Sequence, residues 1–338
     1  MAAPEAAPPA RGQLPQDRRV PPHAPRIGCD FPVTRLGIAV ITYNRLKRLR
    51  QTVNAVRSHC RSPYVLVVAE DGGTDGTRAW CARTGVRVIS GANRGVCWNK
   101  NRGLFALAAL GCDPILLLED DTYPTQTGWE REWIEGTRRW HHLSFLQRWV
   151  EKYILSGAGT AADPYVVDKV TAQCNSISAE ALRAVGFHDT RFHGFGSGHA
   201  EWTGRLKQAG FGFALTPQPG GTVRRASLFI RGGLVSPPAE SWRNEDEAER
   251  NKRVRAEIRA EPPFRYAWRG AEERDEFLAE QRRAGTDLSR IAPELLDAGA
   301  QLEWERLAGI APARPRAKWR EAARFFLRRP APEDTDVE

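Results

Sequence analysis

Signatures of several common protein classes are missing from this sequence. None of its six cysteines belongs to a Cys-x-x-Cys pair or to another zinc-binding spacing, so we expect free thiols in a reducing compartment. No apolar run approaches the roughly 18 residues that a transmembrane helix needs, and the N-terminus lacks the apolar core of a signal peptide. The sequence therefore predicts a cytoplasmic protein, with peripheral contact at the inner face of the membrane left open.

Two nucleotide-binding signatures are also absent. No Gly-x-Gly-x-x-Gly follows an expected strand, and no Gly-x-x-x-x-Gly-Lys-Ser/Thr occurs. These absences argue against a dinucleotide-binding dehydrogenase and against a P-loop NTPase.

The charge balance is basic, with 50 Lys and Arg against 41 Asp and Glu and a formal net charge of +9. Such a balance fits an anionic ligand, a nucleic acid or an acidic membrane surface. A nucleic-acid-binding protein would gather its basic residues into a stripe with aromatics, whereas here they are dispersed among nearly as many acids. Nucleic-acid binding is therefore kept only as an alternative.

Composition divides the chain into four parts. Residues 1–34 are rich in Pro, Ala and Arg and too poor in large apolar groups to fold, so we expect a disordered tail. Residues 35–235 carry alternating strand and helix patterns, which predicts the catalytic domain. Residues 236–330 predict a helical C-terminal extension, and residues 331–338 a second disordered tail. Within the extension, residues 318–329 are basic and amphipathic, which suits either an anionic bilayer or docking on the protein itself.

Strands and helices alternate regularly in the first half of the second part. A buried strand over 36–42 precedes a helix over 46–59, whose apolar residues recur at helical spacing. The alternation continues with strands expected at 64–69, 86–89 and 115–118 and with helices expected up to residue 84 and over 96–110. This rhythm predicts an α/β fold with a doubly wound, mostly parallel sheet.

An acidic triplet ends the last of these strands. The apolar run 114–118 leads directly into Glu119, Asp120 and Asp121. Adjacent carboxylates raise one another's pKa unless a positive charge lies among them, and Mg²⁺ or Mn²⁺ prefers such oxygen ligands. An acidic turn that is simply solvated is the alternative for this motif taken alone.

Other polar segments should meet the triplet at the same edge of the sheet. Residues 42–45 and 70–73 follow the first two strands, and ligands bind at the carboxyl ends of strands in open α/β sheets. Residues 93–104 open a helix with cationic side chains, an arrangement that suits phosphate. Carboxylates for a metal and a cationic helix start together predict a site for a nucleotide diphosphate with Mn²⁺ or Mg²⁺.

Four motifs in order resemble one known family. They are Ile41-Thr42-Tyr43-Asn44-Arg45, Glu70-Asp71-Gly72-Gly73-Thr74-Asp75-Gly76-Thr77, Asn93-x-Gly95-x-x-x-Asn99-Lys100-Asn101-x-Gly103-Leu104 and Leu118-Glu119-Asp120-Asp121. Together they resemble the family 2 glycosyltransferases of the GT-A nucleotide-diphospho-sugar transferase fold, over roughly residues 36–216. The sequence departs from that family where Glu70 stands for a commoner Asp and Lys100 for a commoner Arg.

The resemblance implies a role for each matched side chain. Asp121 is implied to bind the metal directly, with Glu119 as the second candidate ligand. No histidine follows His199, so the metal would otherwise rely on phosphate oxygens and water. The residues implied to contact the nucleotide or the donor sugar are Thr42, Asn44, Arg45, Glu70, Asp71, Asn93, Lys100, Asp120 and Asn175.

A second segment with candidate catalytic residues, 194–206, combines a glycine-rich loop with the start of a helix. Inverting sugar transfer needs a general base for the acceptor hydroxyl, and the family usually supplies it from a Glu-Asp pair that is absent here. Counting back from Arg205 puts His199 at the Asp position, whereas retaining acid chemistry favours Glu201. We prefer Glu201 as the base. The alternative role of Glu201 is an i,i+4 ion pair with Arg205. The alternative role of His199 is a purely structural one.

The sequence as a whole predicts a metal-dependent, inverting glycosyltransferase of the hexosyl- or N-acetylhexosaminyltransferase class. Its donor is expected to be a UDP- or GDP-linked sugar, and its acceptor a glycan, a lipid-linked sugar or a small molecule. The alternatives are a basic nucleic-acid-binding protein and an inactive scaffold that binds nucleotide.

Overall fold

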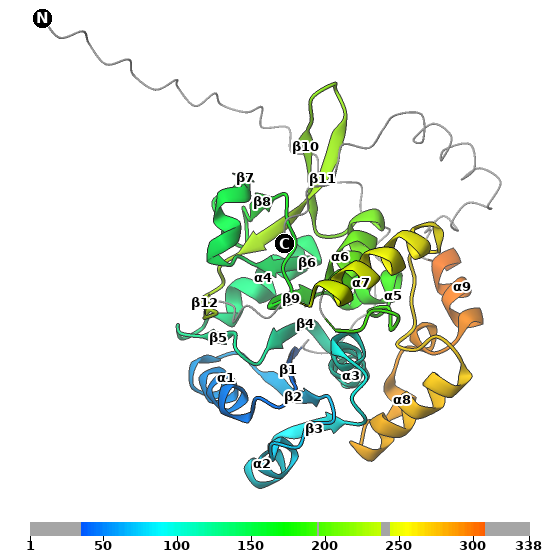
Figure 1. Ribbon diagram of the computed structural model, residues 1–338. Coiled ribbons are helices and arrows are strands. Elements are labelled where there is room, and N and C mark those ends of the chain that lie inside the picture. Colours follow the sequence, from blue (N-terminus) through cyan, green and yellow to red (C-terminus); the bar gives the residue numbers. More distant parts are fainter. Residues whose placement is uncertain (1–34, 195, 238–243, 308–338) are drawn as a thin grey trace, which may run out of the picture.

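A large mixed sheet dominates the computed structural model, which describes residues 35–194, 196–237 and 244–307 (Figure 1). The strands run in the order β3-β2-β1-β4-β9-β6-β11-β8-β7, with β10 paired to β11, while β5 and β12 form a separate pair. The strands are β1 (Arg35–Thr42), β2 (Tyr64–Glu70), β3 (Arg87–Ser90), β4 (Cys112–Glu119), β5 (Tyr123–Pro124), β6 (His142–Phe145), β7 (Ile154–Ser156), β8 (Tyr165–Val167), β9 (Cys174–Ile177), β10 (Phe213–Pro217), β11 (Val223–Ile230) and β12 (Leu234–Val235).

The first half of the sheet is parallel. Strands β3, β2, β1 and β4 all pair in parallel, as βαβ connections require. Beyond β4 the pairing is antiparallel except between β6 and β11. The predicted α/β fold is confirmed, and its parallel pairing is concentrated where the four sequence motifs lie.

Helices cover both faces of the sheet. The α-helices are α1 (Leu46–His59), α2 (Thr77–Thr84), α3 (Val96–Ala109), α4 (Glu130–Trp140), α5 (Ala179–Val185), α6 (Gly198–Gln208), α7 (Glu245–Glu257), α8 (Ala271–Arg283) and α9 (Ala298–Leu307). Short 3-10 helices are η1 (Arg148–Tyr153), η2 (Ile258–Ala260), η3 (Leu288–Arg290) and η4 (Pro293–Leu295).

Alternation along the strands divides the core between the two faces. Ile38 and Val40 of β1 pack in one cluster with residues of α1, α2 and α4. Ala39 and Ile41 of the same strand pack in the other cluster with residues of α3, α5, α6 and α8. The sheet is therefore doubly wound, as predicted.

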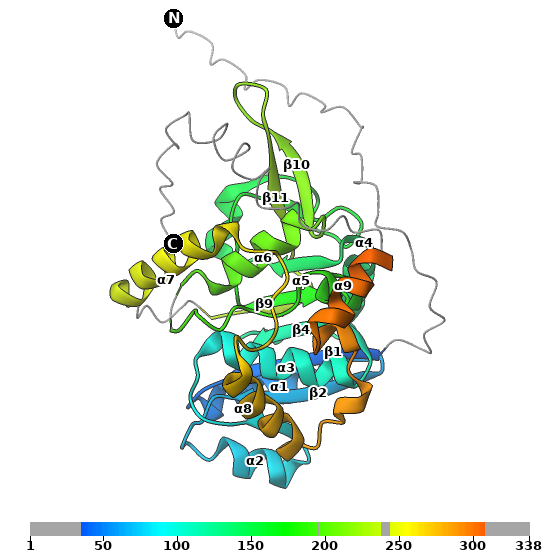
Figure 2. The ribbon, with the colours of Figure 1, turned by 90° about the vertical axis from the view of Figure 1, so that its right-hand side faces the viewer.

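The helical C-terminal extension shares the core of the first domain. Phe277 of α8 is fully buried and packs edge-on against Trp98 and Phe105 of α3, with ring centroids 5.3 Å apart in both pairs. Figure 2 shows α8 alongside α3 on this face. The predicted boundary at residue 235 therefore does not separate two hydrophobic cores.

Some sequence predictions fall outside the described residues. These are the two tails, 1–34 and 331–338, and the basic amphipathic segment 318–329. Within the described ranges, no helix has both the length and the apolar character needed to cross a membrane.

A buried histidine in β6 predicts sensitivity of the fold to acid. His142 contacts the Ser176 carbonyl (2.7 Å) and the Thr203 hydroxyl (3.2 Å) through its two ring nitrogens, and burial lowers its pKa to about 4. Between pH 6.5 and 4 the unfolded chain therefore binds more protons than the folded protein, so acid lowers stability. We expect the free energy of unfolding to fall by roughly 2–3 kcal/mol between pH 7 and 4.5 through this group.

Urea unfolding of the wild type and of His142→Gln at both pH values measures this contribution. The variant should show a smaller loss of stability on acidification. An equal loss in both proteins would contradict the assignment.

Candidate functional site

The ends of β1 and β4 bring a hydroxyl, two carboxylates and a guanidinium together. The Thr42 hydroxyl donates to Asp120 Oδ2 at 2.7 Å. Arg45 reaches both acids, with Nη1 2.8 Å from Asp120 Oδ1 and Nη2 2.6 Å from Asp121 Oδ2. Arg48 on α1 adds a second cation, 3.3 Å from Asp121 Oδ2. Burial raises the pKa of Asp120 to about 7, although the Thr42 hydrogen bond and Arg45 oppose this shift.

The two oxygens of Asp121 differ in their surroundings. Asp121 Oδ1 is buried and has no hydrogen-bond partner among the described residues. A carboxylate oxygen without a donor suits a hard cation, which binds through one or two carboxylates and completes its shell with phosphate oxygens and water. Within the described ranges, no three Asp, Glu, His or Cys side chains converge on a common metal position. The residues therefore fit a metal held jointly with a ligand.

Lys100 lies at the same edge, on α3. Its Nζ is 3.3 Å from Glu119 Oε1 and donates to the Ala172 carbonyl at 3.2 Å. Glu119 in turn donates its backbone N–H to the Gln173 carbonyl. Lys100 therefore neutralises Glu119, and the segment before β9 holds both residues in place.

Asp71 has a structural task in this arrangement. Its carboxylate accepts the backbone N–H groups of Arg94 (3.0 Å) and Gly95 (2.9 Å) and the Arg102 guanidinium (2.7 Å). It thus caps the start of α3 from the end of β2, as acids at helix N-termini do. Asn93, which precedes these groups, is exposed.

Asn44 and Glu70 join the loops that follow β1 and β2. Asn44, in a left-handed conformation with φ 52°, accepts the Thr74 N–H at 2.7 Å through Oδ1. Glu70 is fully buried and accepts from Gly73 N–H and the Ser90 hydroxyl. A Cβ at Gly73 would lie 2.6 Å from Asn44 Oδ1, so this close approach requires glycine.

Asn175 lies within the sheet. Its amide donates to the Ser144 hydroxyl (2.9 Å) and to the Thr171 carbonyl (3.0 Å), and the side chain is 1% exposed. These contacts tie β9 to β6 and to the preceding loop. The role in sugar binding implied by the resemblance is not supported by this placement.

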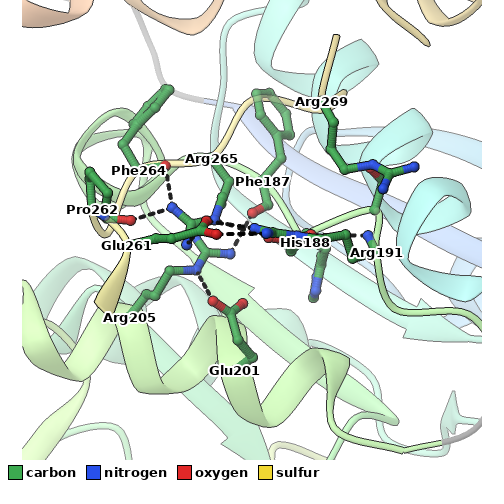
Figure 3. Close-up of polar contacts among 12 residues, drawn as sticks. Phe187, His188, Arg191, Glu201, Arg205, Glu261, Pro262, Phe264, Arg265 and Arg269 are labelled. Atoms are coloured by element: carbon green, nitrogen blue, oxygen red, sulfur yellow. Dashed lines mark hydrogen bonds and ion pairs between the residues drawn. The ribbon is translucent and has the colours of Figure 1, made fainter. Parts of the chain in front are cut away.

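Glu201 forms the ion pair that the sequence left as its alternative. Its Oε1 is 2.7 Å from Arg205 Nε, and both side chains are buried. Figure 3 shows Arg205 pointing from α6 towards Phe187 and Arg265, and its guanidinium donates to the carbonyls of Val185, Phe187 and Pro263. Oε1 of Glu201 therefore takes the alternative role, the ion pair, while Oε2 is buried without a hydrogen-bond partner among the described residues, and the preference for Glu201 as a base stays a prediction.

His199, two residues earlier on α6, lies near Lys100. Its half-buried ring hydrogen-bonds to the backbone of Val170, and burial together with Lys100 lowers its pKa to about 3. Val170 belongs to the same segment whose Ala172 carbonyl binds Lys100. Glu201 and His199 therefore have different surroundings on α6: Glu201 lies in the ion pair, and His199 lies near the segment that binds Lys100.

This geometry agrees with a match in sequence. Residues 37–133 match glycosyl transferase family 2. The family 2 match spans β1 to β4 and the acidic triplet, and it supports a transferase enzyme. It confirms the resemblance carried by the four motifs.

Two solved glycosyltransferase structures are similar to this chain in fold. One is GalNAc-T7 with UDP, GalNAc and Mn²⁺, at 12% identity and a TM-score of 0.49, covering 82% of this chain and 54% of that chain. The other is the mannosyltransferase PcManGT from Pyrobaculum calidifontis with GDP-Man and Mn²⁺, at 15% identity and a TM-score of 0.43, covering 87% and 80%. The chain thus spans about half the length of the GalNAc-T7 chain. A search of curated proteins finds no match. Identities this low say nothing about the substrate.

Three residues next to the family 2 motifs were missed by the sequence reasoning. Arg48 follows Arg45 at i,i+3, a spacing that places the two side chains on the same face and indicates a second cation near the acids. Arg102 lies inside the third motif and binds Asp71, but a buried arginine gives no pattern of its own. Glu280 lies 178 residues from its partner Arg102, and no local signal links them.

Proposed function

We propose that this protein is a metal-dependent, inverting glycosyltransferase that moves a sugar from a UDP- or GDP-linked donor to an acceptor hydroxyl. One observation carries the proposal: the segment matched to family 2 contains Asp121, whose buried Oδ1 lacks a partner among the described residues, whose Oδ2 contacts Arg45 and Arg48, and whose neighbour Glu119 contacts Lys100. A carboxylate and several cations around one point suit a divalent metal and a diphosphate together.

Arg45 and Arg48 balance the acid pair before a ligand arrives. Without them, adjacent ionised Asp120 and Asp121 would repel each other at a buried position. When a nucleotide sugar binds, the same guanidiniums lie within reach of its phosphates, because they already flank the acids. Arginine forks suit phosphate oxygens.

Asp121 would hold Mn²⁺ or Mg²⁺, with Glu119 as the neighbouring acid, and Asp120 is positioned by Thr42 to contact the ribose. When bound, the metal stabilises the negative charge of the leaving nucleoside diphosphate. Lys100 adds a positive charge at the same edge of the sheet. Asp71 orders the start of α3 by accepting the N–H groups of Arg94 and Gly95. The N–H groups that follow these in the first turn of α3 are the ones that suit a phosphate.

We assign the general base to His199. Its ring is neutral, the form that accepts a proton, but burial and Lys100 lower its pKa to about 3, so the bound donor and acceptor must raise that pKa for the proton to be taken up. Oε1 of Glu201 pairs with Arg205. The acceptor, whether glycan, lipid-linked sugar or small molecule, would enter beside α6. We further propose a cytoplasmic location, in which peripheral contact at the inner face of the membrane is left open.

Calorimetric titration with UDP and GDP, each with and without Mn²⁺, tests the donor site. The wild type should bind one nucleotide, at least tenfold more tightly with Mn²⁺, and Asp121→Ala should abolish the Mn²⁺ effect. Glu303→Ala is the matched control, since Glu303 is an exposed acid on α9 that pairs with Arg306.

Two other outcomes of the titration would favour the alternative functions. Binding without turnover of any nucleotide sugar would identify an inactive scaffold. Absence of binding to both nucleotides under every condition would refute the proposal and return weight to nucleic-acid binding.

A further inference from the structure

Glu280 of α8 is buried against the start of α3. It is 1% exposed, and its two oxygens accept from Arg102 Nε and Nη2, both at 2.8 Å. Trp98 Nε1 donates to the same carboxylate at 3.0 Å. The C-terminal extension thus places a carboxylate inside the part of the chain formed by residues 35–235, where an arginine binds it in a bidentate manner.

Arg102 binds Asp71 as well as Glu280. Its Nη1 donates to Asp71 Oδ1 at 2.7 Å and its Nη2 to the Ala92 carbonyl at 2.8 Å. Arg102 is itself fully buried. Asp71, Arg102 and Glu280 therefore form one buried triad that spans β2, α3 and α8.

The triad fixes the loop between β3 and α3. Asp71 holds the N–H groups of Arg94 and Gly95, while Ala92 is held by Arg102. Gly91 lies so close that an added Cβ would collide with the Glu280 carboxylate, so this position requires glycine.

A second contact with α8 lies outside the triad. The Arg94 guanidinium is 3.4 Å from Glu276 and 3.6 Å from Glu273, and it stacks over the Trp98 ring at 4.6 Å. The loop 91–95 is therefore bracketed by the triad on its buried side and by α8 acids on its exposed side.

We propose that Glu280 is a positioning residue for the donor nucleotide and that the C-terminal extension completes the donor site. The inference rests on the proposed function, since loop 91–95 precedes the helix start to which the diphosphate is assigned. Glu280 touches no substrate; it acts by fixing Arg102, and through Arg102 it sets Asp71 and the two N–H groups that Asp71 holds. The extension would then be required for donor affinity and would not be a passive appendage.

The variant Glu280→Gln tests this role, because it keeps the size of the side chain and removes its charge. Its matched control is Glu294→Gln, a buried acid of the same extension that pairs with Arg183 of α5 at 3.0 Å. We expect Kd for the nucleotide that the wild type binds to rise at least tenfold in Glu280→Gln and to stay within twofold in Glu294→Gln. Titrations are made well below the melting temperature of each variant.

Hydrogen exchange provides a readout that overall destabilisation would not reproduce. The amides of Arg94 and Gly95 should exchange at least tenfold faster in Glu280→Gln, while amides of α5 and α6 keep the wild-type rate. If Glu280→Gln does not fold, Glu280→Asp is measured, because it keeps the charge and withdraws the carboxylate from Arg102; its Kd for the nucleotide should also rise at least tenfold.

The outcomes separate the two claims. A wild type that binds nucleotide beside a Glu280→Gln variant of equal affinity overturns the positioning role and leaves the proposed function intact. A wild type that binds neither UDP nor GDP overturns both.

Discussion

Replacing His199 by alanine is expected to lower the rate of sugar transfer at least 100-fold, because a positioned general base typically contributes roughly 10²- to 10⁴-fold. His199 is the one of the two candidates on α6 whose side chain is free of an ion pair in the described structure and lies near Lys100. The affinity for nucleotide should change little, since the base acts on the acceptor. Release of UDP or GDP from the nucleotide sugar measures the rate, and calorimetry measures the affinity.

Glu201→Gln is the companion variant for this experiment. It breaks the pair with Arg205, so its main effect should be on stability, with a much smaller effect on the rate of the folded protein. The opposite ranking, in which folded Glu201→Gln is inactive and His199→Ala retains wild-type activity, would return the base to Glu201.

Replacing Arg102 by glutamine is expected to cost about 3–5 kcal/mol in the free energy of unfolding, as for other buried ion pairs that lose one partner. The loss leaves the carboxylates of Glu280 and Asp71 buried without their counterion. A cost of this size is a large fraction of the roughly 5–15 kcal/mol that stabilises a typical domain. Urea unfolding of the variant and the wild type measures it.

The matched control is Arg224→Gln on β11. Arg224 also forms a close pair, 2.5 Å from Asp168, but the two side chains are 52% and 36% exposed. Exposed pairs typically contribute about 0–1 kcal/mol, so this variant should unfold almost like the wild type. Equal losses in the free energy of unfolding would show that the buried pairs of Arg102 stabilise the fold no more than an exposed pair does.

Periodicity predicted the first half of the fold closely. The helix expected over 46–59 begins and ends at those residues, and the strand expected over 36–42 differs by one residue. Both patterns are local, because each residue's burial follows from its place in a helical or strand repeat. The Ser178 cap of α5 is likewise a local signal, and its hydroxyl accepts the Ala181 N–H.

The roles of the site residues were harder to predict from the sequence than their positions in the fold. The acidic triplet, Thr42 and Arg45 do meet at one edge, because parallel strands end together. Asp71, Glu70 and Asn175, by contrast, are engaged by neighbouring groups that lie far along the chain, such as Arg102, Ser90 and Ser144. A polar residue in a motif looks the same in sequence whether it faces a ligand or the core.

The alternation of strands and helices, the acidic edge and the match of residues 37–133 to glycosyl transferase family 2 could all be predicted from the sequence, since all three depend on neighbouring residues. The packing of the whole fold, by contrast, places His199 near Lys100 and brings Glu280 to Arg102 across 178 residues. A buried charge needs a partner wherever the chain can supply one. Which partner it finds depends on how the helices pack, and packing is a property of the whole fold.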